Sequence, residues 1–188
     1  MNLPKGPEVL NLNCGDDQCA CEMLDDLEVL RRAPVFSGAP IEIIKLYAMF
    51  SQRRSYKAGD FVLRQGDKAD MSFLILFGEL EVFQVYKDKP YNLQVLGKMG
   101  FFGELALLAR FDWFFSVQAR TNAEVLTLDR KSFQKIIAKF PEHQPKIIEK
   151  IVQLRIRRLE NQMHYLFDNL KDEALRDTGE NAPKTVIA

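Results

Sequence analysis

The chain has 188 residues and a mass of 21.7 kDa, a size that suits one domain with an appended helix rather than two full cores. Lysine plus arginine and aspartate plus glutamate both total 26, so the formal net charge is zero, without the basic excess that supports binding to nucleic-acid backbones. No apolar run is long enough to span a bilayer, and the N-terminal region lacks the apolar core of an export signal. We therefore expect a soluble, cytoplasmic protein that does not enter a membrane.

The N-terminal region is acidic and carries all three cysteines of the chain, Cys14, Cys19 and Cys21. An odd number of cysteines this close together does not make a disulfide framework. An iron–sulfur cluster takes four thiolates, and this chain has only three. We expect residues 1–21 to be a flexible segment with free thiols and no bound metal; a redox or metal sensor is an alternative interpretation.

Two short helices are predicted between this segment and the middle of the chain. Leu24, Leu27 and Leu30 recur at helical spacing and predict the first helix. Prolines and a glycine then interrupt the chain over residues 34–40. From Ile41, apolar residues three and four apart predict the second helix, whose end the sequence leaves open.

The middle of the chain, residues 51–128, has the composition of a β structure. Glycines separate short segments rich in β-branched and aromatic residues, and turn signals recur about every eight to twelve residues. This spacing predicts a sandwich, barrel or roll rather than alternating strands and helices. The segment 73–77 is apolar at every position, so we expect a strand buried on both faces, and residues 86–91 are interpreted as a hairpin loop.

The part of the chain after residue 128 is predicted to be helical. Asp129 is a suitable N-cap for a helix that ends before Pro141, and a longer helix is expected after Pro145. In that longer helix, apolar residues step by four and three and form a heptad seam: Val152, Ile156, Leu159, Met163, Leu166 and Leu170. The seam predicts a parallel homodimer, although an amphipathic helix of this kind can also pack on its own domain.

Several short motifs occur in the order that one protein family uses. The segment Phe102-Gly103-Glu104-Leu105-Ala106-Leu107 resembles the phosphate-binding cassette of the cyclic nucleotide-binding domain family, which includes the bacterial catabolite activator protein and kinase regulatory subunits. Lys57-Ala58-Gly59-Asp60, Gln65-Gly66-Asp67 and the segment 74–82 agree with it. The resemblance covers roughly residues 30–170.

This resemblance implies an α+β, mainly β, fold: an eight-stranded β-roll flanked by short N-terminal helices and a long C-terminal helix. The expected organisation is a flexible N-terminus (1–21), a β-roll with flanking helices (22–140), a dimerisation helix (141–170) and a flexible tail (171–188). Only 188 − 170 = 18 residues follow Leu170. That is too few for the helix-turn-helix domain of the transcription factors in this family, so we expect no DNA-binding domain.

The resemblance also implies a ligand site. Backbone N–H groups at the start of a helix suit an anionic phosphate, and in this family the glutamate at the Glu104 position accepts a hydrogen bond from the ribose 2′-hydroxyl. An arginine nine or ten residues later pairs with the cyclic phosphate through two oxygens. The expected ligand-binding residues are Phe102, Gly103, Glu104, Leu105, Ala106, Leu107, Arg110, Trp113, Phe114 and Ser116.

The sequence departs from the family pattern at that arginine. Aligning Ala119-Arg120-Thr121 with the family's strand places Trp113 there, followed by Phe114 and Phe115. An indole has one donor and no charge, so it cannot replace a guanidinium against a phosphate, and the two phenylalanine rings would narrow the site. Arg110 could act as a substitute cation or be a solvated loop residue.

Two functional hypotheses follow. The first is a stand-alone sensor that couples a small ligand, by default cyclic AMP or cyclic GMP, to the position of the C-terminal helix. The second is a degenerate domain that binds no nucleotide and serves as a dimeric interaction scaffold, with Glu104 stabilising the start of its helix. Trp113 favours the scaffold, and the intact cassette motif favours the sensor. No nucleophile–base pair or paired carboxylates are legible, so we expect no enzymatic activity, no cofactor beyond such a ligand, and an unidentified protein partner.

Overall fold

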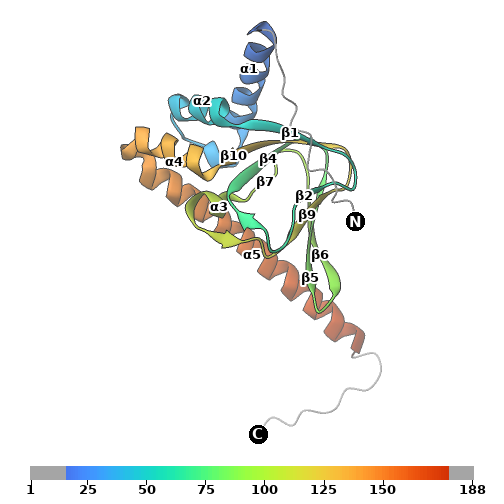
Figure 1. Ribbon diagram of the computed structural model, residues 1–188. Coiled ribbons are helices and arrows are strands. Elements are labelled where there is room, and N and C mark those ends of the chain that lie inside the picture. The colour runs from blue at the N-terminus through green and yellow to red at the C-terminus, as the bar shows by residue number, and fades with distance from the viewer. Residues whose placement is uncertain (1–15, 178–188) are drawn as a thin grey trace. The chain divides into compact units, whose positions relative to one another are not determined.

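The computed structural model describes the backbone of residues 16–177 and the surroundings of the side chains of residues 24–164 and 167. The helical elements are α1 (Asp16–Arg32), η1 (Pro34–Phe36), α2 (Ile41–Phe50), α3 (Glu104–Leu108), α4 (Arg130–Lys139), η2 (Pro141–His143) and α5 (Gln144–Asp177) (Figure 1). The strands are β1 (Gln52–Tyr56), β2 (Phe61–Leu63), β3 (Lys68–Ala69), β4 (Met71–Phe77), β5 (Leu80–Tyr86), β6 (Lys89–Leu96), β7 (Phe101–Phe102), β8 (Phe111–Asp112), β9 (Ser116–Ala119) and β10 (Ala123–Asp129). The chain divides into two compact units, Met1–Ile147 and Ile148–Ala188.

Eight strands of the first unit form two four-stranded antiparallel sheets. Their strand orders are β1-β10-β4-β7 and β2-β9-β5-β6, and the remaining strands, β3 and β8, form a small pair. Strands that are distant in sequence, such as β1 and β10, lie side by side because the chain winds into a roll (Figure 1). The predicted α+β, mainly β, roll is therefore confirmed, and so are the N-terminal helices and the long C-terminal helix.

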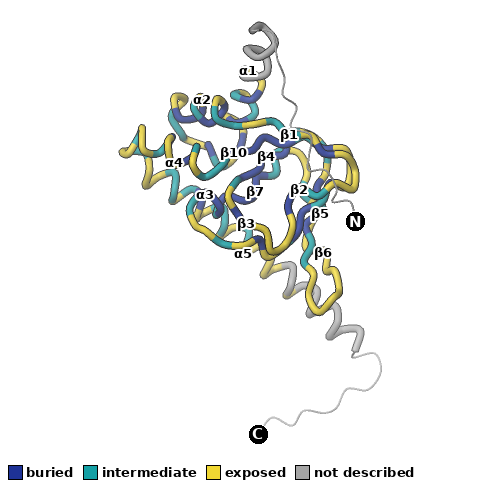
Figure 2. The backbone as a smooth tube through the Cα atoms, viewed as in Figure 1, coloured by how far each residue is buried: buried dark blue, intermediate teal, exposed yellow. Residues whose placement is uncertain are grey.

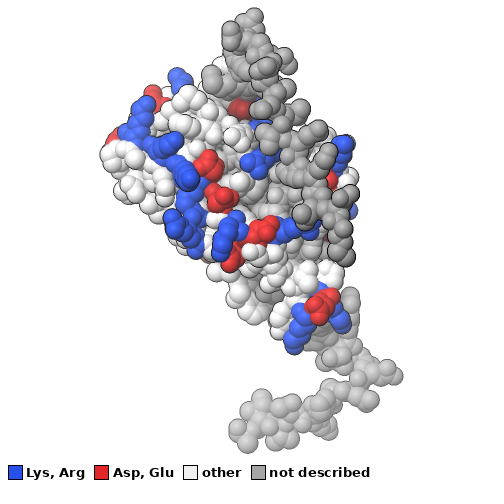
Figure 3. Space-filling model, viewed as in Figure 1, with Lys and Arg blue, Asp and Glu red and all other residues white. Residues whose placement is uncertain are grey.

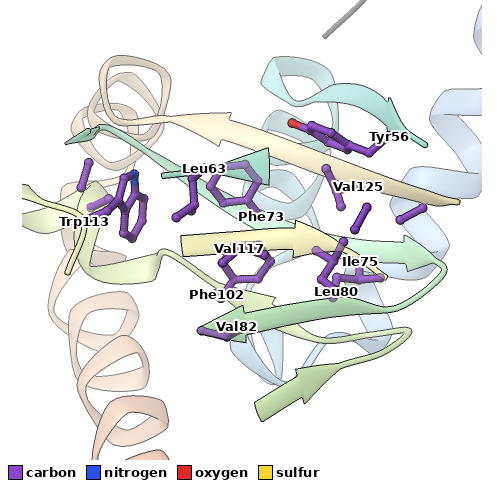
Figure 4. Packing of buried hydrophobic residues seen from close by; sticks show 14 residues of the cluster. Tyr56, Leu63, Phe73, Ile75, Leu80, Val82, Phe102, Trp113, Val117 and Val125 are labelled. Carbon is purple, nitrogen blue, oxygen red and sulfur yellow. The ribbon is translucent and has the colours of Figure 1, made fainter. Parts of the chain in front are cut away.

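The hydrophobic core of the roll lies between the two sheets (Figure 4). Successive residues of a strand point to opposite faces, so each sheet sends alternate side chains into this core. Its buried members include Tyr56, Leu63, Phe73, Ile75, Leu80, Val82, Phe102, Trp113, Val117 and Val125. Removing these apolar and aromatic side chains from water is the main contribution that stabilises the roll.

Helices α2 and α4 cover the other face of the β1-β10-β4-β7 sheet, and α1 packs against α2 (Figures 1 and 2). Leu74 and Leu126 alternate with core residues along β4 and β10 and are buried as well, so this sheet is covered on both faces. The prediction that the strand at residues 73–77 is buried on both faces is confirmed for residues 73–75. Leu76 is half-buried, and Phe77 is 64% exposed at the end of the strand, beside the Gly78 turn.

The hairpin between β5 and β6 is tighter than the sequence indicated. Only Lys87 and Asp88 lie between the two strands, with φ angles of 50° and 61°, and two central residues with positive φ are typical of a type I′ turn. Pro90 and Tyr91 therefore belong to β6, and the prediction of a loop over residues 86–91 was wrong. A proline is tolerated on an edge strand, and β6 is the edge of its sheet.

Both predicted N-terminal helices are present. The helix around Leu24 to Leu30 is the second half of α1, which begins at Asp16, and α2 begins at Ile41 as expected. The prediction of free N-terminal thiols concerns residues whose side chains are not described. Cys14 lies outside the described residues, and so do the side chains of Cys19 and Cys21.

Two polar contacts hold helices to the roll. Asp129 caps α4 as predicted, because its carboxylate accepts hydrogen bonds from the Ser132 backbone N–H at 3.0 Å and from the Ser132 hydroxyl at 2.8 Å. Burial alone would raise the pKa of Asp129, but these hydrogen bonds outweigh it and lower that pKa below its usual value. Arg53 of β1 donates to Asp26 of α1 and to Glu124 of β10, each at 2.9 Å, and so fastens α1 to the sheet.

Helix α5 runs from Gln144 to Asp177, past the expected end at residue 170. Residues 171–177 contain no proline or glycine, which explains the extension. The seam residues whose side chains are described are all exposed: Val152 (43%), Ile156 (50%), Leu159 (53%) and Met163 (45%). The side chains of Leu166 and Leu170 lie outside the described residues. Over residues 16–177, no helix is both long and apolar enough to cross a membrane.

Candidate functional site

The cassette motif forms a sharp connection from β7 to α3. Gly103 lies between them with a φ of 77°, in the left-handed region that favours glycine. A Cβ atom at this position would lie 2.7 Å from the carbonyl oxygen of Met71 and 3.1 Å from Cη2 of Trp113. Glycine is therefore required here, because it lets the start of α3 approach both β4 and the Trp113 ring.

Glu104 is the first residue of α3, and only 2% of its surface is exposed. A buried hydrogen bond joins the Tyr47 hydroxyl of α2 to the Ser72 hydroxyl of β4 at 2.9 Å. Burial raises the pKa of Tyr47 far above its usual range, and the negative charge of Glu104 raises this pKa further, against the opposing effect of the Ser72 bond. The buried Glu104 carboxylate therefore lies close enough to Tyr47 of α2 to affect its ionisation.

Trp113 stands at the position where the family pattern has its arginine, and it is 4% exposed. Phe111 and Phe115 pack against the indole, with ring centroids 5.4 and 5.5 Å away. Phe73 of β4 lies 6.5 Å from the indole and stacks on Phe102 at 4.8 Å. An aromatic cluster therefore occupies the place in which the resemblance implies a cation facing a phosphate (Figure 4).

The backbone of Trp113 is hydrogen-bonded on both sides to the turn at residues 65–67. The Trp113 N–H donates to the carbonyl oxygen of Asp67 at 2.8 Å, and the Gly66 N–H donates to the Trp113 carbonyl oxygen at 2.7 Å. The Gln65 N–H donates to the hydroxyl of Ser116 at 3.0 Å, and Ser116 is buried. These bonds hold the backbone from which the indole projects, and the Ser116 hydroxyl accepts from the same turn.

The structure buries some of the predicted site residues and exposes others. The buried ones are Phe102, Gly103, Glu104, Ala106, Leu107, Trp113 and Ser116. Leu105 is half-buried and Arg110 is exposed. Phe114 is 47% exposed, so Phe115 rather than Phe114 is the neighbouring ring that packs on Trp113.

Arg130, the first residue of α4, is a residue of this region that sequence reasoning missed. Its guanidinium donates hydrogen bonds to the carbonyl oxygens of Ala106 and Ala109, at the end of α3, and to that of Ala69 at 2.6 Å. The end of a helix leaves carbonyls of this kind without partners in the helix. Arg130 therefore fastens α3 to the start of α4. No local pattern signals this, because the contacts join segments 24 and 61 residues apart in sequence.

The side chains around α3 carry charges of both signs. Glu104 brings a carboxylate, the guanidinium of Arg130 is engaged with backbone carbonyl oxygens, and Trp113 offers a single indole N–H. On the face shown in Figure 3, Lys and Arg side chains are interspersed with Asp and Glu side chains instead of forming one continuous basic surface. Among the residues that the structure describes, no three His, Cys, Asp or Glu side chains are placed to hold a metal ion.

Known proteins of one family are similar to this chain in sequence. Residues 53–140 match the family described as the cyclic nucleotide-binding domain. The chain is similar to the cAMP-dependent protein kinase type II regulatory subunit of Drosophila melanogaster, with 32% identity over 142 residues. The match covers 75% of this chain and 36% of that protein, so the chain spans only about a third of this relative's length.

Solved structures of the same family share the fold. The catabolite activator protein of Thermus thermophilus is 27% identical with a TM-score of 0.61, and the match covers 73% of this chain and 63% of that one. A cyclic nucleotide-binding domain from Methylobacillus flagellatus is 19% identical with a TM-score of 0.68, over 78% of this chain and 83% of that one. Residues 53–140 and the roll that they build are therefore a domain of the cyclic nucleotide-binding domain family.

Proposed function

We propose that this domain is a regulatory interaction module that works without a bound cyclic nucleotide. The observation that carries the proposal is the buried indole of Trp113 at the position of the family's arginine, packed by Phe111 and Phe115. A phosphate could reach this place only if the ring left the core and gave up its packing. Of the two functional hypotheses, this geometry favours the scaffold.

The energetic cost of the missing guanidinium is large. A bidentate, charge-assisted pair with a phosphate in a partly desolvated site contributes on the order of 3 kcal/mol. Its loss alone lowers affinity roughly a hundredfold. Moving Trp113 out of the core costs more, since truncating a buried tryptophan to alanine destabilises proteins by about 3–5 kcal/mol. The two costs together amount to about 6–8 kcal/mol, a loss of affinity of at least about ten-thousandfold relative to a pocket that carries the arginine.

The module would act through helix α5 and a second copy of the chain. The seam residues Ile156, Leu159 and Met163 are 50%, 53% and 45% exposed on this helix. Soluble proteins rarely leave a stripe of this kind uncovered, and the heptad spacing suits a second helix of the same sequence. A parallel homodimer would cover the stripe and present two rolls to a partner protein.

Calorimetry on the full chain with cyclic AMP and cyclic GMP is the direct test. Adenosine and guanosine, which lack the phosphate, serve as matched ligands. Trp113 is the single tryptophan of the chain, so its fluorescence reports on the site in parallel. We expect neither saturable heat nor a change in emission with either cyclic nucleotide up to about 1 mM. A dissociation constant below about 10 µM for either one would contradict the proposal.

Glu104 favours a second candidate function, the ligand sensor. Its burial at the first position of α3, directly after Gly103, keeps the cassette geometry in place. A sensor would need a cation in place of the arginine, and Arg110 is close to that position in sequence. If cyclic AMP does bind, Arg110→Ala should abolish binding. Arg120→Ala is the control, since Arg120 is also exposed but pairs with Glu79 at 3.6 Å; loss in the first variant alone would establish the sensor instead of the scaffold.

A further inference from the structure

The Trp113 ring touches the helix that the family pattern places around a ligand. A Cβ atom on Gly103, at the start of α3, would lie 3.1 Å from Cη2 of the indole. Ala106, in the middle of α3, is fully buried in the same cluster as Trp113. The indole is therefore part of the surface on which α3 rests.

The other end of α3 is held as well. Arg130 donates from its side chain to the carbonyl oxygens of Ala106 and Ala109. Its own backbone N–H donates to the carbonyl oxygen of Asp70 at 2.8 Å. Because Asp70 directly precedes β4, Arg130 joins three elements at one point: the end of α3, the start of β4 and the start of α4.

We propose that the Trp113 indole is a built-in occupant of the cassette site. It fills the place of a ligand, holds α3 against β4 in one position and, through Arg130, keeps the start of α4 in one position too. This inference rests on the proposed function, because a site that the protein fills with its own side chain needs no cyclic nucleotide. In this arrangement α3 does not switch between two positions, and the module stays in a single state.

Hydrogen exchange in the Trp113→Ala variant tests whether the indole holds α3 in one position. The readout is the pair of α3 amides at Ala106 and Ala109, whose N–H groups donate to the carbonyl oxygens of Gly103 at 3.0 Å and Leu105 at 2.9 Å. We expect these two amides to exchange at least about tenfold faster in the variant than in the wild type, after the change in global unfolding is allowed for. That factor is equivalent to a fall of about 1.4 kcal/mol in the free energy of local opening.

The matched control is Leu80→Ala. Leu80 is fully buried in the same cluster but lies at the opposite end of it from Trp113 (Figure 4). Its truncation should lower global stability without singling out α3. If Trp113→Ala does not fold, Trp113→Phe keeps a ring and should accelerate the same amides by a smaller factor.

A rescue experiment separates occupancy from general loss of packing. The alanine variant leaves an apolar cavity, and such cavities bind free aromatic molecules. Indole added to Trp113→Ala should therefore bind saturably and slow the exchange of the Ala106 and Ala109 amides toward the wild-type rate. It should have no such effect on Leu80→Ala.

Equal acceleration of the α3 amides in the Trp113 and Leu80 variants would overturn the inference, and so would a failure of indole to slow them. Either result leaves the proposed function standing, because that proposal depends only on the wild type's failure to bind cyclic nucleotides. Tight binding of cyclic AMP by the wild type would instead contradict the proposed function itself. The two failures are therefore distinguishable.

Discussion

The Trp113 cluster and the seam of α5 are both apolar, but they differ in exposure. Trp113 is 4% exposed, whereas Leu159 and Met163 are 53% and 45% exposed. Among the described residues, rings of the roll pack on the indole, while the seam residues on α5 remain exposed. The contrast supports the proposal that the cassette site is filled within one chain, whereas α5 pairs with a second copy.

Charging the α5 seam is the change with the largest expected effect on this comparison. In a parallel dimer, Leu159→Lys places two ammonium groups in one core layer, and burying an unpaired charge costs several kcal/mol. We expect dimer affinity to fall about a thousandfold, equivalent to about 4 kcal/mol. Light scattering should then give a mass near 21.7 kDa for the variant and about twice that for the wild type.

Asn161→Lys is the control for that substitution, since Asn161 is exposed and lies outside the seam. It should leave the dimer intact. A wild-type mass near 21.7 kDa at micromolar concentration would contradict the dimer and would remove the contrast between the two regions.

Restoring the family's arginine tests the cassette side of the comparison. Trp113→Arg combined with Phe115→Ala introduces a guanidinium and removes the ring that packs on this position at 5.5 Å. We expect affinity for cyclic AMP, measured by calorimetry, to rise at least roughly a hundredfold over the wild type, the gain from the guanidinium alone. Glu104→Ala in the same background should remove the gain.

Trp113→Arg with Phe114→Ala is the matched double variant. Phe114 is 47% exposed, so truncating it makes no room beside the new side chain, and the gain should be smaller. If both double variants fold but neither gains affinity, the cassette has lost its ligand geometry at more than one position. Trp113 alone would then not account for the loss.

The smallest expected effect concerns the cap of α4, next to Arg130. Asp129→Ala removes the carboxylate that accepts from Ser132 and should cost about 1 kcal/mol of unfolding free energy near neutral pH. Hydrogen bonding lowers the pKa of Asp129 in the folded state. The contribution of the carboxylate is therefore fully present above the unfolded pKa of about 3.9, and it is lost as the pH falls through the folded pKa.

Denaturant titrations check this cap. The difference between wild type and Asp129→Ala should shrink as the pH is lowered from about 7 to about 2. Asp112→Ala is the comparison variant, because Asp112 pairs with Lys68 at an exposed position and should change stability by less than about 1 kcal/mol. A cap effect that grows toward low pH would show that the sign of the pKa shift is wrong.

Features that depend on local chemistry could be predicted before the fold was known. The Asp129 cap and the start of α2 at Ile41 need only a few neighbouring residues, and they are where the sequence placed them. The roll was predicted because the cassette around Gly103 and the other family motifs are local as well. The type I′ turn at Lys87 and Asp88 escaped prediction, because neither residue is the glycine that usually signals positive φ.

The filling of the cassette site depends on packing between segments that are distant in the chain. The sequence placed Trp113 at the arginine position but could not say whether the ring faces the core or the solvent, nor that Phe115 packs on it while Phe114 is exposed. Adjacent residues of an extended chain point to opposite sides, and packing against distant strands decides which side is buried. The contacts of Arg130 could not be predicted for the same reason. Its carbonyl partners are up to 61 residues away in sequence and become its neighbours only when the roll forms.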